Sequence, residues 1–270
     1  MSPLLEVKNL VKEYPVKRNL IGRVSESRRA VEDVSFTLDE GRTLAVVGES
    51  GAGKSSVARM VLRLIDPTAG EIWFKGTEIA GLSRSRFQQY RRDIQMVFQD
   101  PYSSLQPLMT VGDSVAEPLL LHTDLDRAAR RKKAEELLEQ VGLSRRLAGR
   151  RPHELSGGML QRVSIARALS VEPSLVVCDE PVAALDVSIR AQVINLLMDI
   201  QAERGLSYLF ISHDLHLVRH IADDVVIMKQ GRVKEYGECE RVFTAPEDPY
   251  AKELLGASLK PVTVDAAPAI

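Results

Sequence analysis

The stretch TLAVVGESGAGKSSVARMVL, residues 43–62, decides the fold class of this chain. Residues 43–47 form a short apolar run with β-branched members, which is typical of a buried strand. A glycine-rich turn follows over residues 48–53, and residues 56–62 have the apolar spacing of a helix. A strand, a tight turn and a helix in this order make half of a βαβ unit, so the stretch predicts a mostly parallel sheet covered by helices.

The glycine-rich turn also contains a phosphate-binding pattern, because residues 48–55 read GESGAGKS and match G-x-x-x-x-G-K-[ST]. Glycines let the backbone turn its N–H groups toward phosphate oxygens, and the helix that follows adds a positive N-terminus. Lys54 is expected to reach the β- and γ-phosphates and Ser55 to hold magnesium. A glycine turn that binds nothing is the alternative. The expected nucleotide-binding residues of this segment are Gly48, Ser50, Gly51, Gly53, Lys54, Ser55 and Ser56.

Two acidic residues end a second apolar run, LVVCDE at residues 175–180. A charge at the end of a buried strand needs a partner, and Mg²⁺ supplies one for Asp179. Glu180, one residue further, is placed to polarise an attacking water as a general base. A salt bridge without a catalytic role is the alternative. Beside the phosphate pattern, the two acids predict that the chain binds ATP with Mg²⁺ and hydrolyses it.

The other segments predict an α/β protein with two additions to a parallel core. Alternating apolar residues at 5–7 and 34–38, with a hairpin at 71–76, indicate an N-terminal antiparallel β subdomain. The segment 126–141 has an apolar helical face and indicates an inserted helical subdomain. Further core strands are expected at 175–178, 208–211 and 225–228, the last paired with 233–235. The expected division is 1–98 and 165–237 for the core with its β subdomain, 99–164 for the helical subdomain, and 238–270 for a C-terminal extension with a disordered tail.

Composition disfavours several classes of protein. The 270 residues include 36 Lys+Arg and 37 Asp+Glu, so the net charge of −1 gives no electrostatic reason to expect nucleic acid as a partner. A basic cluster between residues 15 and 29 is expected to be a solvated loop. Two cysteines, Cys178 and Cys239, fit a reducing compartment and build neither a disulfide framework nor a zinc site. We expect no signal peptide and no membrane-spanning segment.

A third motif narrows the class, because residues 155–162, LSGGMLQR, resemble the signature motif of ATP-binding cassette (ABC) ATPases. Further landmarks of that family appear in order over about residues 5–240. Gln99 resembles the Q-loop glutamine, residues 184–186 resemble the D-loop, and His213 resembles the switch histidine. Tyr14 stands where these proteins stack adenine on an aromatic ring. Taken singly, Gln99, His213 and Tyr14 also fit ordinary packing, and His213, His216 and His220 have the spacing of a metal site.

The resemblance implies a mechanism that needs two subunits. Two such chains face each other head to tail, and ATP lies between the phosphate loop of one and the signature motif of the other. Ser156, Gly157 and Gly158 would therefore act on the partner's ATP. The implied catalytic residues are Glu180, His213, Gln99 and Lys54, and the implied metal ligands are Ser55, Gln99 and Asp179. Met159-Leu160 and Ala183 depart from the usual residues of the signature motif and the D-loop.

A narrower resemblance concerns the ATPases of dipeptide and oligopeptide import. It is carried by QDPYSSLQP at 99–107, GESG at 48–51, the basic segment 15–29, VF at 242–243 and PYAKELL at 249–255. It implies a second ABC ATPase subunit, two membrane permease subunits and an extracytoplasmic substrate-binding protein as partners. It also implies peripheral attachment to the cytoplasmic face of the bacterial inner membrane, with residues 100–122 as the docking surface.

Several alternatives stay open at this point. Importers of nickel or glutathione share the same features, and Cys239 alone cannot build the iron–sulfur site of some relatives. A non-transport ABC ATPase that acts on DNA or ribosomes is a rival, which the neutral charge disfavours. A nucleotide-regulated subunit with negligible turnover is a second rival, which Glu180 and His213 disfavour.

Overall fold

The structure is a computed structural model that describes residues 2–18 and 24–258. The strands are β1 (Leu5–Arg18), β2 (Val24–Leu38), β3 (Thr43–Val47), β4 (Ala69–Phe74), β5 (Thr77–Glu78), β6 (Ile94–Val97), β7 (Leu175–Asp179), β8 (Ser207–Ile211), β9 (Asp224–Lys229) and β10 (Arg232–Glu238). The helices are α1 (Lys54–Val61), α2 (Arg84–Phe87), α3 (Pro101–Ser104), α4 (Val111–His122), α5 (Arg127–Gln140), α6 (Gly157–Leu169), α7 (Val187–Arg204), α8 (Leu215–Ile221), α9 (Cys239–Thr244) and α10 (Pro249–Ser258), and short 3₁₀ turns are η1 (Gln88–Arg91), η2 (Arg145–Gly149) and η3 (Pro152–Glu154).

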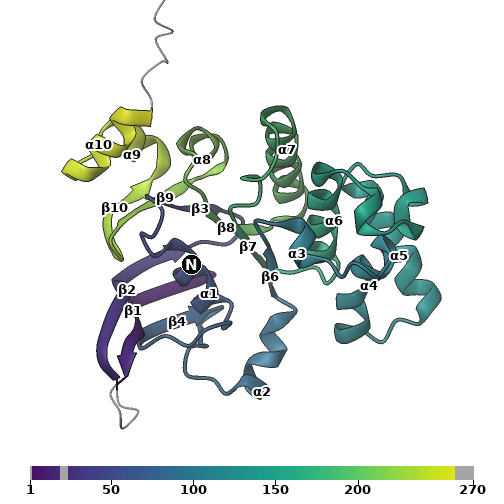
Figure 1. Ribbon diagram of the computed structural model, residues 1–270, viewed down its shortest axis with the longest axis horizontal. Coiled ribbons are helices and arrows are strands. Elements are labelled where there is room, and N and C mark those ends of the chain that lie inside the picture. Colours follow the sequence, from purple (N-terminus) through teal and green to yellow (C-terminus); the bar gives the residue numbers. More distant parts are fainter. Residues whose placement is uncertain (1, 19–23, 259–270) are drawn as a thin grey trace, which may run out of the picture.

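Two sheets organise the described part of the chain (Figure 1). A four-stranded antiparallel sheet has the order β2-β1-β4-β5. A six-stranded sheet has the order β10-β9-β3-β8-β7-β6, in which β9 to β6 are parallel and β10 is antiparallel at the edge. The expected mostly parallel core and N-terminal antiparallel unit are confirmed.

The six-stranded sheet is buried on both faces, which explains why its strands read as continuous apolar runs. On β3, Leu44 and Val46 pack with α1 and the antiparallel sheet. Ala45 and Val47 on the same strand pack toward the opposite side, which α6, α7 and α8 cover. α1 is therefore held between the two sheets, with the phosphate pattern at its N-terminus.

Helices α3 to α6 extend from one end of the parallel sheet (Figure 1). Asp126 begins α5 by accepting the Ala129 N–H at 2.8 Å, and Leu137 and Leu138 are buried as the apolar face predicted. Gly142, with φ 74°, follows the end of the helix. The division that the sequence predicted between residues 164 and 165 falls inside α6, which runs unbroken to Leu169.

The basic segment expected as a loop at 15–29 is mostly strand, so this expectation was wrong. β1 continues to Arg18 and β2 begins at Val24, and residues 19–23 lie outside the described part. Arg29 on β2 bonds Glu13 on β1 at 2.6 Å, and this pairing of opposite charges across strands favours the longer ladder. The predicted tail, residues 259–270, also lies outside the described residues.

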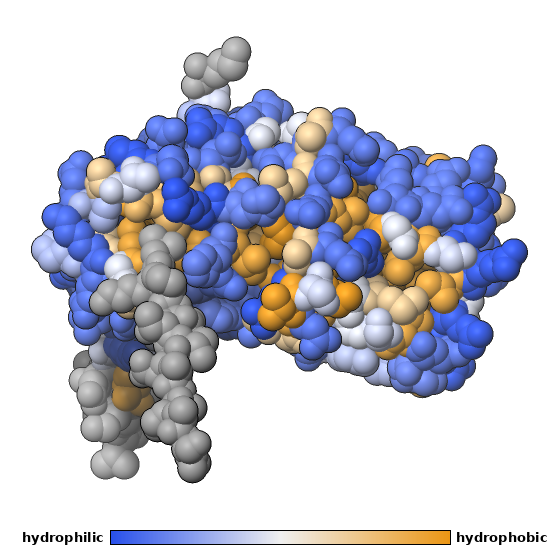
Figure 2. All heavy atoms as spheres, turned by 90° about the horizontal axis from the view of Figure 1, so that it is seen from above, coloured by the Kyte–Doolittle hydropathy of each residue, from blue (hydrophilic) through white to orange (hydrophobic). Residues whose placement is uncertain are grey.

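Apolar side chains remain exposed on the surface of the helical region. Leu121 is 71% exposed and Leu108 is 82% exposed. Figure 2 shows apolar patches across the middle of another face, the one that carries α7 and α8, while both ends of that face are mainly hydrophilic. Over the residues that the structure describes, no helix has the length and apolar character needed to cross a membrane.

Candidate nucleotide site

A cavity of about 810 Å³ gathers most of the residues predicted to bind nucleotide. It lies where the phosphate loop, residues 48–53, meets the β1–β2 ladder and the β9–β10 turn. The predicted residues that line it are Tyr14, Ser50, Gly51, Gly53, Lys54, Ser55, Ser56, Gln99 and Glu180. Sequence reasoning missed seven others, Val16, Arg28, Arg29, Ala30, Ala52, Gln230 and Gly231. The Gln230-Gly231 turn was visible as a hairpin signal, but nothing local indicated that it borders the phosphate loop.

The phosphate loop needs glycine at both of its ends for steric reasons. Gly48 has φ 146°, and a Cβ there would lie 2.2 Å from the Met228 carbonyl oxygen. Gly53 has φ 103°, and a Cβ there would lie 2.4 Å from the Ala30 carbonyl oxygen. Both approaches are to backbone atoms, which cannot move aside as a flexible side chain does. The loop is therefore wedged between β2 and β9.

Lys54 is buried at the start of α1 and is held by the loop itself. Its Nζ donates to the Gly48 carbonyl at 2.8 Å and to the Glu49 carbonyl at 2.9 Å. Burial lowers the pKa of Lys54, while the negative charges of Glu180 and Asp179 oppose this shift. An ammonium group has three donors, so one remains for a phosphate oxygen.

Ser55 and Asp179 form a pair of oxygen donors beside the loop. The Ser55 hydroxyl donates to Asp179 Oδ1 at 3.0 Å. Asp179 is 8% exposed, and its burial raises the pKa of the carboxyl group against the opposing hydrogen bond from Ser55. A buried carboxylate with a hydroxyl is the hard oxygen set that Mg²⁺ prefers. The residues present therefore fit a magnesium ion that carries nucleotide phosphates.

Three predicted catalytic residues converge at the carboxyl ends of neighbouring strands. Glu180 Oε2 accepts from Gln99 Nε2 at 3.2 Å, and Glu180 Oε1 lies 3.2 Å from His213 Nδ1. They follow β7, β6 and β8 respectively, which are adjacent in the sheet. Glu180 has φ 49°, a left-handed conformation that its own N–H stabilises by bonding the Ile211 carbonyl at 2.9 Å. Such strain in a non-glycine residue is typical of functional sites.

His213 is not a packed core histidine, because 60% of its side chain is exposed. The metal site suggested by the spacing of His213, His216 and His220 has no support either. Over residues 2–18 and 24–258, no group of three or more His, Cys, Asp or Glu side chains is arranged to hold an ion.

The aromatic ring of Tyr14 borders the cavity from β1 and is 37% exposed. Lys12 Nζ lies 5.3 Å from the centroid of this ring. The ring is therefore not buried in the core, and a flat ligand can reach it.

The signature residues lie in a different cavity, of about 680 Å³. Ser156, Gly157 and Gly158 line it together with the D-loop residues 184–186. Ser156 is exposed at the N-terminus of α6, and its side chain makes no capping hydrogen bond within the described residues. The chain thus brings the signature motif and the D-loop together but keeps both away from its own phosphate loop.

Comparisons with known proteins agree with this geometry. The family model described as ABC transporter matches residues 31–183. A probable peptide ABC transporter ATP-binding protein, y4tS of Sinorhizobium fredii, is 49% identical over 96% of this chain and 73% of its own length. The dipeptide transport ATP-binding protein DppF of Haemophilus influenzae is 48% identical over 95% of this chain and 78% of its own length. The glutathione import ATP-binding protein GsiA of Escherichia coli is 49% identical over 95% of this chain, which spans 41% of that protein.

Solved structures match the whole cassette. The dimeric, ADP- and phosphate-bound post-hydrolysis structure of the ATP-binding cassette MJ0796 has a TM-score of 0.77 and 31% identity over 87% of this chain and 98% of that one. CbiO1 of Clostridium perfringens, part of the ABC transporter complex cbiONQ, has a TM-score of 0.78 and 28% identity over 91% of this chain and 92% of that one. With the family model and relatives near half identity, the chain belongs to the ABC transporter family as an ATPase cassette.

Proposed function

We propose that this chain binds ATP with Mg²⁺ at the phosphate loop and hydrolyses it, with Glu180 as the general base. The observation that carries the proposal is the placement of the Glu180 carboxylate. Gln99 and His213 hold it at the edge of the cavity that Lys54 and Ser55 also line. A base must be fixed within reach of the water that it deprotonates. A hydrogen bond from Gln99 and the close contact with His213, which follow two separate strands, fix this one.

Each neighbouring residue has a role that follows from the polar atoms that it offers. The loop N–H groups and Lys54 bind the phosphates. Ser55, Asp179 and the side-chain amide oxygen of Gln99 would hold Mg²⁺, which would supply positive charge to the phosphates. Glu180 takes a proton from the attacking water, and His213 keeps the carboxylate oriented next to the γ-phosphate. Tyr14 stacks on adenine, which contributes about 1–3 kcal/mol by analogy with base–aromatic stacking.

A second subunit completes the site in this proposal. The signature residues Ser156, Gly157 and Gly158 open α6, whose N–H groups suit a γ-phosphate, yet they line a cavity apart from the phosphate loop. A head-to-tail pair places the signature motif of each subunit on the ATP of the other. The likeness to a dimeric ATP-binding cassette supports this arrangement.

Peptide import is the transport function that we propose. The relatives y4tS and DppF are named for peptide and dipeptide transport. The partners would be a second ABC ATPase subunit, two permease subunits and an extracytoplasmic substrate-binding protein, at the cytoplasmic face of the bacterial inner membrane. Residues 100–122, with Leu108 and Leu121 exposed, are the proposed docking surface for the permeases.

Glutathione import is the second candidate, because GsiA is as similar as y4tS. Uptake of a labelled dipeptide and of labelled glutathione by the assembled transporter separates the two. Uptake of glutathione alone would exclude the proposed dipeptide cargo.

The substitution Glu180→Gln tests the hydrolytic proposal. It keeps the shape of the side chain and removes its basicity, so ATP binding stays and phosphate release by the assembled ATPase falls at least about tenfold. Glu172→Gln is the matched control, because Glu172 also has a positive φ but pairs with Lys133 on the surface. Turnover by Glu180→Gln equal to that of the wild type would exclude Glu180 as the base.

A further inference from the structure

The β9–β10 turn, which also lines the nucleotide cavity, is bonded directly to the phosphate loop. The Gly231 N–H donates to the Ala52 carbonyl at 3.0 Å. At the other end of the loop, the close approach of Gly48 to the Met228 carbonyl leaves no room for a Cβ. Because these contacts join backbone to backbone, a displacement of the β9–β10 turn moves the loop with it.

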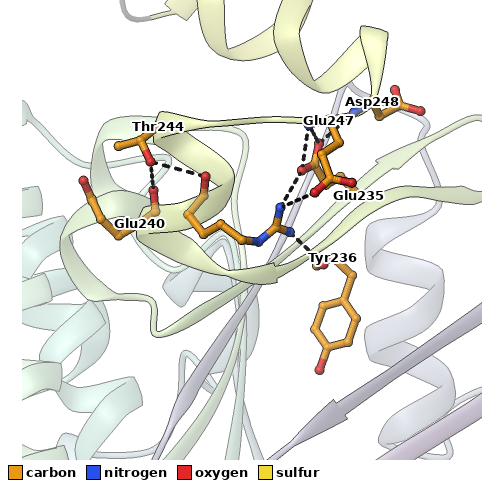
Figure 3. A network of polar contacts seen from close by, with 7 residues as sticks. Glu235, Tyr236, Glu240, Thr244, Glu247 and Asp248 are labelled. Atoms are coloured by element: carbon orange, nitrogen blue, oxygen red, sulfur yellow. Dashed lines mark hydrogen bonds and ion pairs between the residues drawn. The ribbon is translucent and has the colours of Figure 1, made fainter.

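The C-terminal segment is anchored on the same hairpin by one buried carboxylate, that of Glu235 on β10 (Figure 3). Glu235 is 7% exposed, and it accepts from the Glu247 N–H at 3.0 Å and from the Asp248 N–H at 3.1 Å. Arg241 Nη1 also contacts it at 3.4 Å. A carboxylate buried among backbone N–H groups holds them firmly, so the residues that lead into α10 have a fixed position.

Tyr250, in the first turn of α10, is directed by this anchor toward the back of the phosphate loop. The residue is 7% exposed, and Lys229 Nζ, at the end of β9, lies 4.0 Å from its ring centroid. The hydroxyl is buried and has no well-aligned hydrogen bond among the described residues. Burial raises the pKa of Tyr250, and the negative charge of Glu49 in the phosphate loop adds to the rise. The hydroxyl therefore already lies at Glu49 and interacts with its side chain and backbone, but in a poorly aligned geometry. A buried hydroxyl in poor alignment with a carboxylate gains free energy when it donates to that carboxylate in good alignment.

We propose that Tyr250 is a positioning residue for the phosphate loop, and that its hydroxyl donates to the Glu49 carboxylate when the loop closes on ATP. The connection to the nucleotide is short, because the Glu49 carbonyl accepts from Lys54 Nζ. Neither Tyr250 nor Glu49 lines the nucleotide cavity, so the effect acts through the backbone of the loop. The inference rests on the proposed binding of ATP at this loop.

A double-mutant cycle tests the coupling between the two side chains. Tyr250→Phe removes only the hydroxyl, and Glu49→Gln removes only the charge. Each single variant should weaken binding of ATP with Mg²⁺ about threefold to tenfold, and the double variant should weaken it no more than either single one. Tyr236→Phe is the matched control, since Tyr236 lies on β10 but bonds Thr37 on β2, and its ATP affinity should equal that of the wild type.

Thermal stability separates positioning from simple structural support. Without nucleotide, Tyr250→Phe should melt at the wild-type temperature or above it, because the lost hydroxyl makes no well-aligned hydrogen bond in that state. With ATP, its stabilisation should be smaller than that of the wild type. Wild-type affinity in Tyr250→Phe, or additive losses in the double variant, would overturn the inference. A wild-type chain that does not bind ATP would instead overturn the proposed function.

Discussion

At the scale of single residues, Asp179 combines a proposed role in holding Mg²⁺ with a cost in stability. Its raised pKa means that the carboxylate ion is less favourable in the folded protein than in the unfolded chain. Asp179→Asn replaces the carboxylate by a neutral amide of the same shape and so removes this cost. We expect the metal-free variant to melt above the wild type and the Mg²⁺-dependent part of its ATP affinity to fall at least about tenfold.

The exposed Asp39 provides the control for this prediction, because Asp39→Asn should change neither quantity. Differential scanning calorimetry with and without Mg²⁺ measures the melting temperatures, and titration calorimetry measures the ATP affinity. A lower melting temperature for metal-free Asp179→Asn would show that burial of the carboxylate is not the dominant cost.

The ring of Tyr14 leads to a second prediction at this scale. Lys12 lies over the ring, which borders the nucleotide cavity. The proposed stacking of adenine would therefore use an aromatic side chain that also has a cation beside it. Tyr14→Ala should weaken ATP binding at least about fivefold, while Tyr14→Phe keeps the ring and should bind normally. Fluorescence titration with an ATP analogue measures both affinities. A loss in Tyr14→Phe as large as in Tyr14→Ala would assign the effect to the hydroxyl and not to stacking.

At the scale of elements, the two cysteines report on separate parts of the fold. Cys178 lies in the fully buried strand β7 of the parallel sheet, and Cys239 begins α9 next to the anchor of the C-terminal segment. Burial raises the pKa of Cys178 above its usual range and that of Cys239 to about 11, so both thiols stay neutral and unreactive at pH 8. In moderate urea we expect Cys239 to react with a thiol reagent before Cys178. Local unfolding of a terminal segment costs less free energy than unfolding of a fully buried strand such as β7.

A variant of the anchor sharpens this prediction. Glu235→Gln weakens the hydrogen bonds from the N–H groups of residues 247 and 248 to this side chain. The variant should therefore speed the labelling of Cys239 without changing that of Cys178. Peptide mapping by mass spectrometry after timed labelling assigns each thiol. Equal labelling rates at both cysteines over the whole urea range would show that the C-terminal segment and the core open as one unit.

The elements that sequence could predict are those whose signal is local. The strand 43–47 and its glycine turn, the apolar face of α5 and the hairpin of β9 and β10 depend on residues next to one another in the chain. The long β1–β2 ladder was missed because its segment is basic and polar, and its stability depends on cross-strand pairs such as Glu13 with Arg29. Tyr250 was predicted only as part of a C-terminal motif. Its place behind the phosphate loop depends on Glu235, a contact that leaves no periodic pattern in the sequence.

At the scale of the whole molecule, the strand order explains which site residues come together. Gln99, Glu180 and His213 are far apart in the chain, yet each follows one of three adjacent parallel strands, so the sheet edge collects them. Motif order in the sequence indicated this grouping. The separation of the signature motif from the phosphate loop, in contrast, appears only when α6 is placed in space.

This separation leads to the last prediction, which concerns assembly. If the signature motif serves the ATP of a facing subunit, Ser156→Arg should block closure of the pair without touching the chain's own phosphate loop. The isolated variant should bind ATP with the wild-type affinity, whereas phosphate release by the assembled ATPase should fall at least about tenfold. Arg151→Ala, at an exposed position before η3, serves as the control and should keep full turnover. Full phosphate release by assembled Ser156→Arg, or loss of ATP binding by the isolated variant, would mean that the signature motif does not act across a subunit interface.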